Sequence, residues 1–206
     1  MASRAYRART QPQRTQATRE RIRRAVAELL AEGTFHESTV EAVADRAGVS
    51  RATLYQHFGS RLGLVDAICE TFGANPALPA LKRSAALEDP ERALAETFAH
   101  GVEFCASEED VLRQLYGAAA IDQAAGALVE RQTRDRRGVC ERLVAGIDAA
   151  GRLHPGLDRQ TAVALALLLT SFETFVELRR RGDLEQDEVE RTLLETARTL
   201  LLAPAG

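Results

Sequence analysis

The sequence predicts an all-α fold, and two observations support this prediction. Apolar residues recur along the chain at the three- and four-residue spacing of a helix, and no segment alternates apolar and polar residues as a half-buried strand would. Glycine, proline and capping residues divide this pattern into segments of helical length. We therefore expect about nine helices and no sheet, with an N-terminal three-helix helix-turn-helix domain followed by a larger helical domain.

The N-terminal elements follow from short local signals. An apolar stripe over residues 22–30 predicts the first helix. Ser38 and Glu41 have the spacing of a capping box, so we expect Ser38 to be the N-cap of a second helix that ends at Gly48. Ser50 is expected to cap a short third helix. A fourth helix follows, and its apolar residues share one side: Leu62, Val65, Ile68, Cys69 and Phe72.

The rest of the chain is also predicted to be helical. Residues 75–79, with two prolines, are interpreted as a break. Asp89 followed by Pro90 is typical of an N-cap with proline at the first helical position, and Ser107 begins another predicted helix. Three longer helices are expected over residues 123–150, 158–181 and 185–202.

Positive charge is concentrated at the N-terminal end. Residues 1–61 contain 11 arginines and six acidic residues, whereas the remaining 145 residues contain 16 basic and 24 acidic residues. In a chain of net charge −3, this asymmetry indicates that the N-terminal end contacts a polyanion, although a charge cluster alone can equally be a solvated tail. We expect a disordered basic arm over residues 1–14, a first domain over residues 15–61 and a second domain over residues 62–206.

Composition excludes several other classes of protein. The longest strictly apolar run, Ala162 to Leu169, is too short to cross a bilayer, so we expect no membrane segment. The first 13 residues lack the apolar core of a secretory signal. Three scattered cysteines are typical of a reducing compartment, so a cytoplasmic protein is expected. The metalloprotease, hydrolase, P-loop and dinucleotide motifs are missing from the sequence, so we expect neither an enzyme nor a cofactor.

Residues 48–61, GVSRATLYQHFGSR, contain a short helix with two different sides. On a helical wheel, Leu54 and Phe58 fall together and are expected to face the domain core. The remaining positions are short or polar: Arg51, Ala52, Thr53, Tyr55, Gln56 and His57. A helix with a thin apolar stripe and a wide polar face is suited to the major groove of DNA.

The polar side chains of this helix suggest separate roles at DNA. Arginine can bridge O6 and N7 of guanine and glutamine can bridge N6 and N7 of adenine, so Arg51 and Gln56 are candidates for base recognition. Thr53 can donate a hydrogen bond to a phosphate or contact a thymine methyl group. Tyr55 and His57 lie at the flanks, where phosphate oxygens are expected. The alternative, which applies mainly to Tyr55, is a core residue whose hydroxyl group has a partner.

A specific residue pattern runs through this region. It consists of A-G-V-S-x-x-T-L-Y-x-H-F-x-S over residues 47–60, preceded by Gly33-Thr34-Phe35 and Ser38-Thr39-Val40. With these residues, the segment Thr18 to Ile68 resembles the N-terminal DNA-binding domain of the TetR (tetracycline-repressor-like) transcription regulators. Two positions depart from the family, because Arg61 stands where lysine is usual and Gly63 where glutamate is frequent. Gly63 is expected to weaken the first turn of the fourth helix by about 1 kcal/mol.

The resemblance implies a transcription regulator that binds a palindromic operator in double-stranded DNA as a homodimer. A repressor that leaves the operator when a small-molecule effector binds the C-terminal domain is expected, although some family members activate. The positions that the resemblance assigns to DNA are Thr39, Ser50, Arg51, Ala52, Thr53, Tyr55, His57 and Arg61, to which the helical wheel adds Gln56.

The C-terminal domain is expected to hold both the dimer interface and the effector pocket. Residues 162–169 are apolar nearly all round, which fits a helix with a core on one face and a second subunit on the other, or else an ordinary core helix. The expected interface residues are Leu165, Leu168, Phe172 and Leu194. The pocket candidates, which favour a largely apolar effector and are otherwise plain core residues, are Phe98, Phe104, Leu112, Tyr116 and Phe172.

Two further functions compete with a specific regulator. A metal or redox sensor is suggested by His100 and Glu103, which have ligand spacing with Cys105 nearby, but the sequence contains no second cluster of ligands. A non-specific architectural DNA-binding protein would use the basic N-terminal end. The acidic larger part of the chain and the base-recognising side chains of the short helix argue against it.

Overall fold

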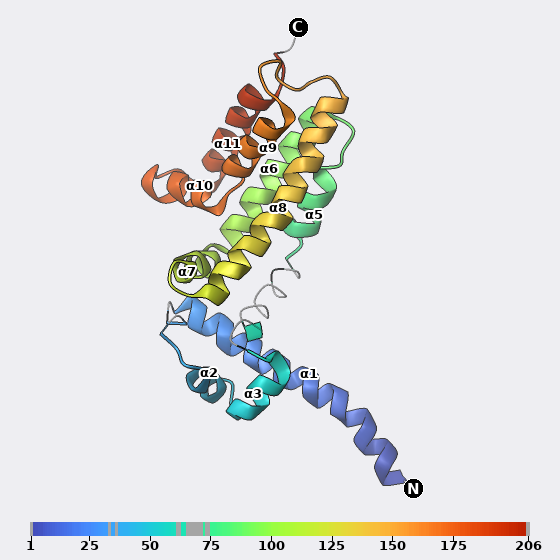
Figure 1. Cartoon of the computed structure of the whole chain (residues 1–206), viewed down its shortest axis with the longest axis vertical. Coiled ribbons are helices and arrows are strands. Elements are labelled where there is room, and N and C mark those ends of the chain that lie inside the picture. The colour runs from blue at the N-terminus through green and yellow to red at the C-terminus, as the bar shows by residue number, and fades with distance from the viewer. Residues whose placement is uncertain are drawn as a thin grey trace. The chain divides into compact units, whose positions relative to one another are not determined.

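Helices form the regular secondary structure of the parts that the computed structural model describes, which are residues 2–32, 34–35, 37–60, 63–64, 72 and 75–204 (Figure 1). Of residues 2–14, 30, 31 and 124, only the backbone is described. These parts contain ten α-helices of defined bounds and one π-helical turn, which confirms the all-α fold class. An isolated antiparallel bridge joins Leu153 to Leu202.

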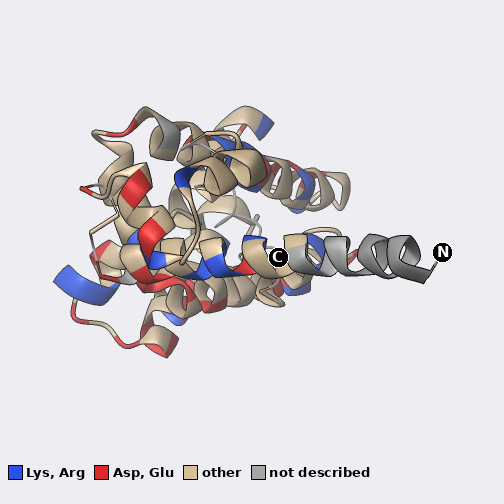
Figure 2. Cartoon of the chain, turned by 90° about the horizontal axis from the view of Figure 1, so that it is seen from below, with Lys and Arg blue, Asp and Glu red and all other residues tan. Residues whose placement is uncertain are grey.

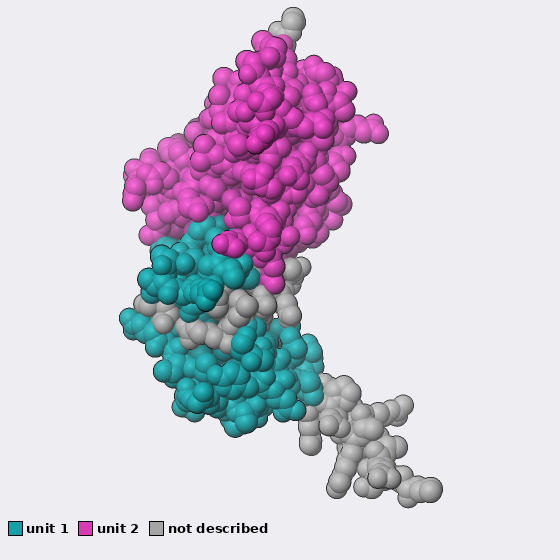
Figure 3. Space-filling model, viewed as in Figure 1, with its two compact units in different colours: residues 1–71, 113–129 teal, residues 72–112, 130–206 magenta. Residues whose placement is uncertain are grey.

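The chain divides into two compact units (Figure 3). Unit 1 comprises residues 1–71 and 113–129, and unit 2 comprises residues 72–112 and 130–206. Unit 1 therefore contains the whole of the predicted first domain, residues 15–61, and in addition a segment from the middle of the chain.

Unit 1 begins with three helices, α1 (Ala2–Ala31), α2 (Val40–Arg46) and α3 (Arg51–Phe58). Since α1 begins at Ala2, residues 2–14 are helical, whereas we expected a disordered arm there. Alanine, arginine and glutamine are frequent in this segment and are good helix formers, which explains the longer helix. A role of this segment at DNA stays a prediction.

The second helix begins one residue later than predicted. Thr39 is its N-cap, because the Thr39 hydroxyl accepts a hydrogen bond from the amide of Ala42 at 3.1 Å. The Ser38 hydroxyl instead donates to the carbonyl of Thr34 at 2.8 Å, so the predicted capping box of Ser38 and Glu41 is wrong. The carboxylate of Glu41 lies in the first turn of α2, where the helix dipole favours a negative charge.

The three N-terminal helices pack around a small apolar core. An ion pair also joins α2 to the end of α1, with Arg46 Nη1 2.7 Å from Glu32 Oε1 and Arg46 Nη2 3.0 Å from Glu32 Oε2. This two-bond geometry holds the pKa of Glu32 below its ordinary value, chiefly through the hydrogen bond from Arg46. The buried apolar residues of this core are Ile22, Ala25, Val26, Leu29, Phe35, Val43, Ala44, Ala47, Leu54 and Phe58.

The later helices are α5 (Ala77–Ser84), α6 (Pro90–Ser107), α7 (Glu109–Ala119), α8 (Gln123–Ala149), α9 (Arg159–Leu169), α10 (Phe172–Val176), the π-helical turn η1 (Glu177–Arg181) and α11 (Gln186–Leu201). Within unit 2, α6 packs against α5 and α11, and α11 also packs against α9 (Figure 1). Leu94, Phe98, Ala166 and Leu193 are among the residues that these helices bury in a common core.

One helix of unit 2 was not predicted. α5 begins at Ala77, inside the segment 75–79 that we interpreted as a break. The Asn75 Oδ1 atom accepts from the amide of Ala77 at 3.0 Å, and Pro79 lies in the first turn, where a missing N–H group breaks no helical hydrogen bond. The prolines therefore begin this helix instead of preventing it.

The helix expected over residues 158–181 is interrupted after Leu169. The Thr170 hydroxyl donates to the carbonyl of Ala166 at 2.7 Å, and the Ser171 hydroxyl accepts from the amide of Thr174 at 3.1 Å as the N-cap of α10. Hydroxyl side chains that bond to nearby backbone groups compete with the helical pattern, which explains the break between α9 and α10.

Candidate nucleic-acid interface

A tight turn joins α2 to α3. Gly48 has a φ of 63°, in the left-handed region that favours glycine, and its amide donates to the carbonyl of Asp45 at 3.0 Å. Ser50 then caps α3, because its hydroxyl accepts from the amide of Thr53 at 3.1 Å. The two helices thus form the helix-turn-helix that the spacing of glycine and serine predicted.

The predicted core side of α3 is confirmed. Leu54 and Phe58 are buried, and the guanidinium carbon of Arg19 from α1 lies 4.9 Å from the centre of the Phe58 ring. All the other residues of α3 are exposed or half-buried: Arg51, Ala52, Thr53, Tyr55, Gln56 and His57. The helix therefore presents its polar face to solvent.

Tyr55 and His57 differ in their exposure on this face. Tyr55 is 37 % exposed, so the interpretation of Tyr55 as a core residue is wrong. The half-buried ring of His57 lies next to Phe58, with ring centres 6.5 Å apart. His57 therefore covers the edge of the core while part of its ring remains accessible.

The hydroxyl groups of the candidate residues are also located near helix N-termini. Thr39 caps α2, and the hydroxyls of Ser50 and Thr53 are 2.8 Å apart at the start of α3. Amide groups in a first helical turn favour an approaching anion. Thr39, Ser50 and Thr53 can thus combine side-chain and backbone hydrogen bonds to phosphate.

Arg51 has two partners in the first turns of α2 and α3. Its Nη1 atom pairs with Glu41 Oε1, and its guanidinium carbon lies 5.4 Å from the centre of the Tyr55 ring. The hydrogen bond with Tyr55, followed by the charge of Glu41, raises the pKa of Arg51 above its ordinary value. Glu41 was not among the predicted site residues, because it lies on a different helix and only the geometry of the turn brings it to Arg51.

The remaining predicted contact, Arg61, lies outside the described residues. Basic and acidic segments are interspersed along the helices in Figure 2.

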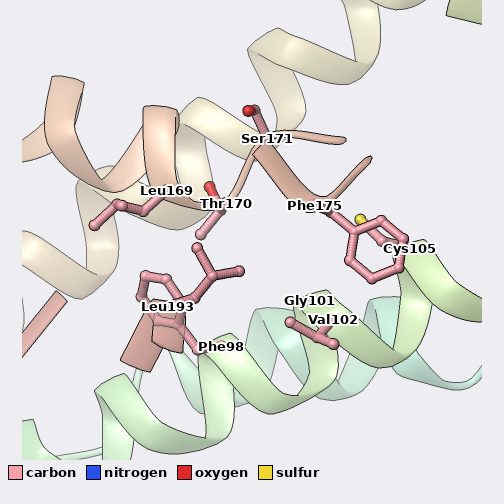
Figure 4. A pocket seen from close by; sticks show the side chains of 9 residues that line it. All are labelled: Phe98, Gly101, Val102, Cys105, Leu169, Thr170, Ser171, Phe175 and Leu193. Carbon is pink, nitrogen blue, oxygen red and sulfur yellow. The ribbon is translucent and has the colours of Figure 1, made fainter. Parts of the chain in front are cut away.

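Unit 2 contains a pocket between α6, α11 and the break after α9 (Figure 4). Its cavity volume is about 10 Å³, room for about one water molecule, so the pocket would have to widen to hold a ligand of the usual pocket size of about 300–1,000 Å³. Its lining residues are mostly apolar: Phe98, Gly101, Val102, Cys105, Leu169, Thr170, Ser171, Phe175 and Leu193.

Of the five residues predicted for a pocket, only Phe98 lines this one. Phe104 packs edge-on against Phe72 at 5.7 Å, and Phe172 stacks on Phe175 at 6.2 Å. Leu112 is buried and Tyr116 is half-buried, without either lining the pocket. Helical spacing could not locate these residues, because the pocket depends on the break at Thr170 and Ser171, which we did not predict.

Comparison with known proteins agrees with this geometry. Residues 22–68 match the family model described as bacterial regulatory proteins, tetR family, a range that includes α2, the turn and α3. Residues 22–68 therefore form a region similar to the DNA-binding domain of the tetR family. A curated tetR-family relative, the HTH-type transcriptional regulator UidR from Escherichia coli strain K12, is 35 % identical over 80 residues. That match covers 39 % of this chain and only 32 % of the length of UidR.

Solved structures share the tetR-family fold over most of the chain. NalD, the secondary repressor of the MexAB-OprM multidrug efflux pump in Pseudomonas aeruginosa, is 24 % identical with a TM-score of 0.69, and the match covers 94 % of this chain and all of NalD. SmeT in complex with triclosan is 19 % identical with a TM-score of 0.70, and the match covers 92 % of this chain and 93 % of SmeT. At these identities the similarity establishes the fold.

The residues predicted for the tetR-family dimer interface fall into two groups. Leu168 on α9 is 60 % exposed, and Leu165 and Leu194 are half-buried. Phe172, in contrast, is only 5 % exposed and packs within the chain. We expected a surface residue at this position, and the structure shows a buried one. The break after Leu169 is the reason, since a new helix begins at Phe172 and its side chain turns inward.

The cysteines bear on the alternative of a redox or metal sensor. Burial raises the pKa of Cys105 to about 12, and burial also raises the pKa of Cys140. A thiol in this environment forms little thiolate and reacts slowly. Cys69 lies outside the described residues, and within the described ranges no three metal-binding side chains converge.

None of the described helices alone has the length and apolar character needed to cross a membrane. Arg159–Leu169 and Phe172–Arg181 reach that threshold only as a pair, which is bent by 46°.

Proposed function

We propose that this chain is a homodimeric transcription regulator of the tetR family that binds a palindromic operator in double-stranded DNA. The exposed polar face of α3 carries the proposal, because it combines residues able to contact bases and phosphates on a helix fixed by a buried Leu54 and Phe58. DNA binding implies a cytoplasmic location. Repression is the favoured mode of action, because NalD, which shares the fold, is a repressor.

The residues of the helix-turn-helix divide into two proposed roles. Arg51 and Gln56 are exposed and can form paired hydrogen bonds with base edges, while Ala52 and Thr53 allow close approach of the backbone. The residues proposed to hold phosphates are Thr39, Ser50, Thr53, Tyr55, His57 and Arg61.

The pocket of unit 2 is the proposed effector site. Its apolar lining, with Thr170, Ser171 and Cys105 as the polar groups, favours a small, uncharged and largely apolar molecule. The complex of SmeT with triclosan is an example of such a ligand in a structure of the same fold. α10 begins at this pocket. A bound molecule can therefore shift the equilibrium between conformations in which α10 is placed differently, and in this way alter operator binding.

Selection of bound fragments from a random or genomic DNA pool tests the DNA-binding part of the proposal. An inverted repeat with matching half-sites is expected. Binding without sequence preference, with strong salt dependence, would instead favour an architectural DNA-binding protein. A reporter gene behind the selected operator then distinguishes repression from activation.

A further inference from the structure

We propose that Glu41 is a positioning residue for Arg51 and that its carboxylate weakens ion pairing between Arg51 and DNA phosphates. Glu41 would thereby set how strongly the protein prefers its operator over other DNA. This inference rests on the proposed function, since it assigns a recognition role to a residue outside α3.

The position of Glu41 leaves its carboxylate available to Arg51. Thr39 satisfies the N-terminus of α2 through the amide of Ala42, so Glu41 takes no part in the cap that its spacing suggested. Glu41 Oε1 instead meets Arg51 Nη1 at the start of α3. The side chains of Arg51 and Glu41 are 59 % and 52 % exposed, so the pair lies on the surface that DNA would approach.

The pair and Tyr55 together restrict the Arg51 side chain. The guanidinium group pairs with the Glu41 carboxylate through Nη1 and lies over the Tyr55 ring, whose centre is 5.4 Å from the guanidinium carbon. Arginine has five N–H donors in a planar fork, so a contact at Nη1 leaves further donors for O6 and N7 of guanine. A side chain that is already restricted loses less conformational entropy when it binds.

The same carboxylate acts differently toward phosphates. An exposed ion pair contributes little to folding, so its effect on unfolding is expected to be small. At DNA, however, Glu41 offsets the positive charge of Arg51 and repels an approaching phosphate. A guanine compensates for this repulsion with two directed hydrogen bonds, whereas a phosphate contact in random sequence does not. Raising the free energy of the wrong complexes in this way increases specificity.

The experiment begins with site selection by the unmodified protein, followed by Kd measurements on the selected operator and on a scrambled duplex over a series of salt concentrations. Glu41→Gln removes the charge. Its affinity for the scrambled duplex should rise about fivefold per half-site, the effect expected for a unit charge about 4 Å from a phosphate in water. The slope of log K against log salt should steepen by about 0.9 for each additional phosphate neutralised. The ratio of specific to non-specific affinity should fall.

Two further variants separate charge from position. Glu41→Asp keeps the charge but shortens the side chain, so the salt slope should stay unchanged while the preference at the Arg51 base position relaxes. Glu130→Gln is the matched control, because Glu130 on α8 is also an exposed partner of an arginine, 4.0 Å from Arg134, and the change in net charge is the same. Glu130→Gln should leave the affinity ratio unchanged.

The possible results are distinguishable. If the unmodified protein selects no sequence, the proposed function fails and the inference fails with it. If it selects an operator and Glu41→Gln behaves like Glu130→Gln, the function stands and the role of Glu41 is overturned. If Glu41→Asp keeps the full base preference, the positioning role is overturned. Thermal unfolding checks each variant, and Glu41→Asp provides the comparison if Glu41→Gln does not fold.

Discussion

Arg51 and His57 lie on the same eight-residue helix but in different surroundings. Arg51 is exposed and fixed by Glu41 and Tyr55, whereas His57 is half-buried next to Phe58. A long exposed donor can reach a base edge, and a half-buried ring at the flank can reach only the nearer backbone of the DNA. The two side chains should therefore contribute differently to specificity.

Substitution of each residue should separate these contributions. Arg51→Ala is expected to weaken operator binding about 5- to 150-fold per half-site and to relax the preference mainly at one base position. His57→Ala should weaken binding to all operators by similar factors and leave the preference intact. Site selection with each variant beside the unmodified protein measures both effects. An unchanged preference in Arg51→Ala would mean that Arg51 binds a phosphate and that Gln56, Thr53 or DNA shape provides base recognition.

Gly63 shows a close approach that propensity alone did not reveal. We expected this glycine only to weaken its helix, but a Cβ atom at Gly63 would lie 1.8 Å from the carbonyl oxygen of Phe58, the last residue of α3. The amide of Gly63 also donates to the Ser60 hydroxyl at 3.1 Å. A side chain at position 63 would therefore displace backbone at the end of α3.

Gly63→Ala accordingly tests whether the steric clash of a Cβ atom costs more stability than the higher helix propensity of alanine adds. Alanine should add about 1 kcal/mol of helix stability, but the backbone shift should outweigh this gain and leave a net loss of about 1–3 kcal/mol. Gly146→Ala is the control, because Gly146 lies in α8 and a Cβ atom there would meet nothing within 4 Å beyond its chain neighbours and the backbone of its own helix. This change should stabilise the protein by up to about 1 kcal/mol. Urea unfolding measures both, and equal stabilisation by the two variants would contradict the close approach.

At the scale of elements, the sequence predicted what local signals determine. Gly48 and Ser50 define the turn and the cap of α3 within a few residues, and the 3.6-residue period identifies Leu54 and Phe58 as core. Glu41 and the pocket could not be predicted in this way, because each requires side chains from different helices. Their positions depend on packing and, for the pocket, on the break at Ser171.

The cap of α10 provides a test of this break. Ser171→Ala removes the hydroxyl that accepts from Thr174 and should cost about 1 kcal/mol. Loosening α10 should also expose Cys105, which shares the pocket with Ser171, and a change of this size corresponds to about fivefold faster labelling by a thiol reagent. Asp158→Ala is the control, since Asp158 caps α9 through Thr161 at 2.8 Å but does not line the pocket. Peptide mapping measures the labelling rate of Cys105, which should not rise in Asp158→Ala. Similar labelling rates in Ser171→Ala and Asp158→Ala would contradict local opening.

At the scale of the whole molecule, the proposed palindromic operator requires two copies of the helix-turn-helix. One short recognition helix contacts only a few base pairs, so a symmetric dimer supplies the rest of the specificity. Leu168 is the best candidate for a contact between subunits, because a large apolar side chain that is 60 % exposed on α9 would gain from burial in a partner. Phe172 no longer qualifies, since it is already buried within its own chain.

Leu168→Glu should therefore shift the protein from dimer to monomer at micromolar concentration while each chain remains folded. A charge at this position loses the apolar contact and meets its own symmetry copy across the interface, if the two-fold axis passes near α9. Ile121→Glu is the matched control, because Ile121 is 75 % exposed and lies between α7 and α8, outside α9 and α11. It introduces the same charge at an exposed apolar position and should leave the dimer intact. Sedimentation velocity of the three proteins decides the matter: a monomeric unmodified chain, or equal masses for Leu168→Glu and the unmodified protein, would remove Leu168 from the interface.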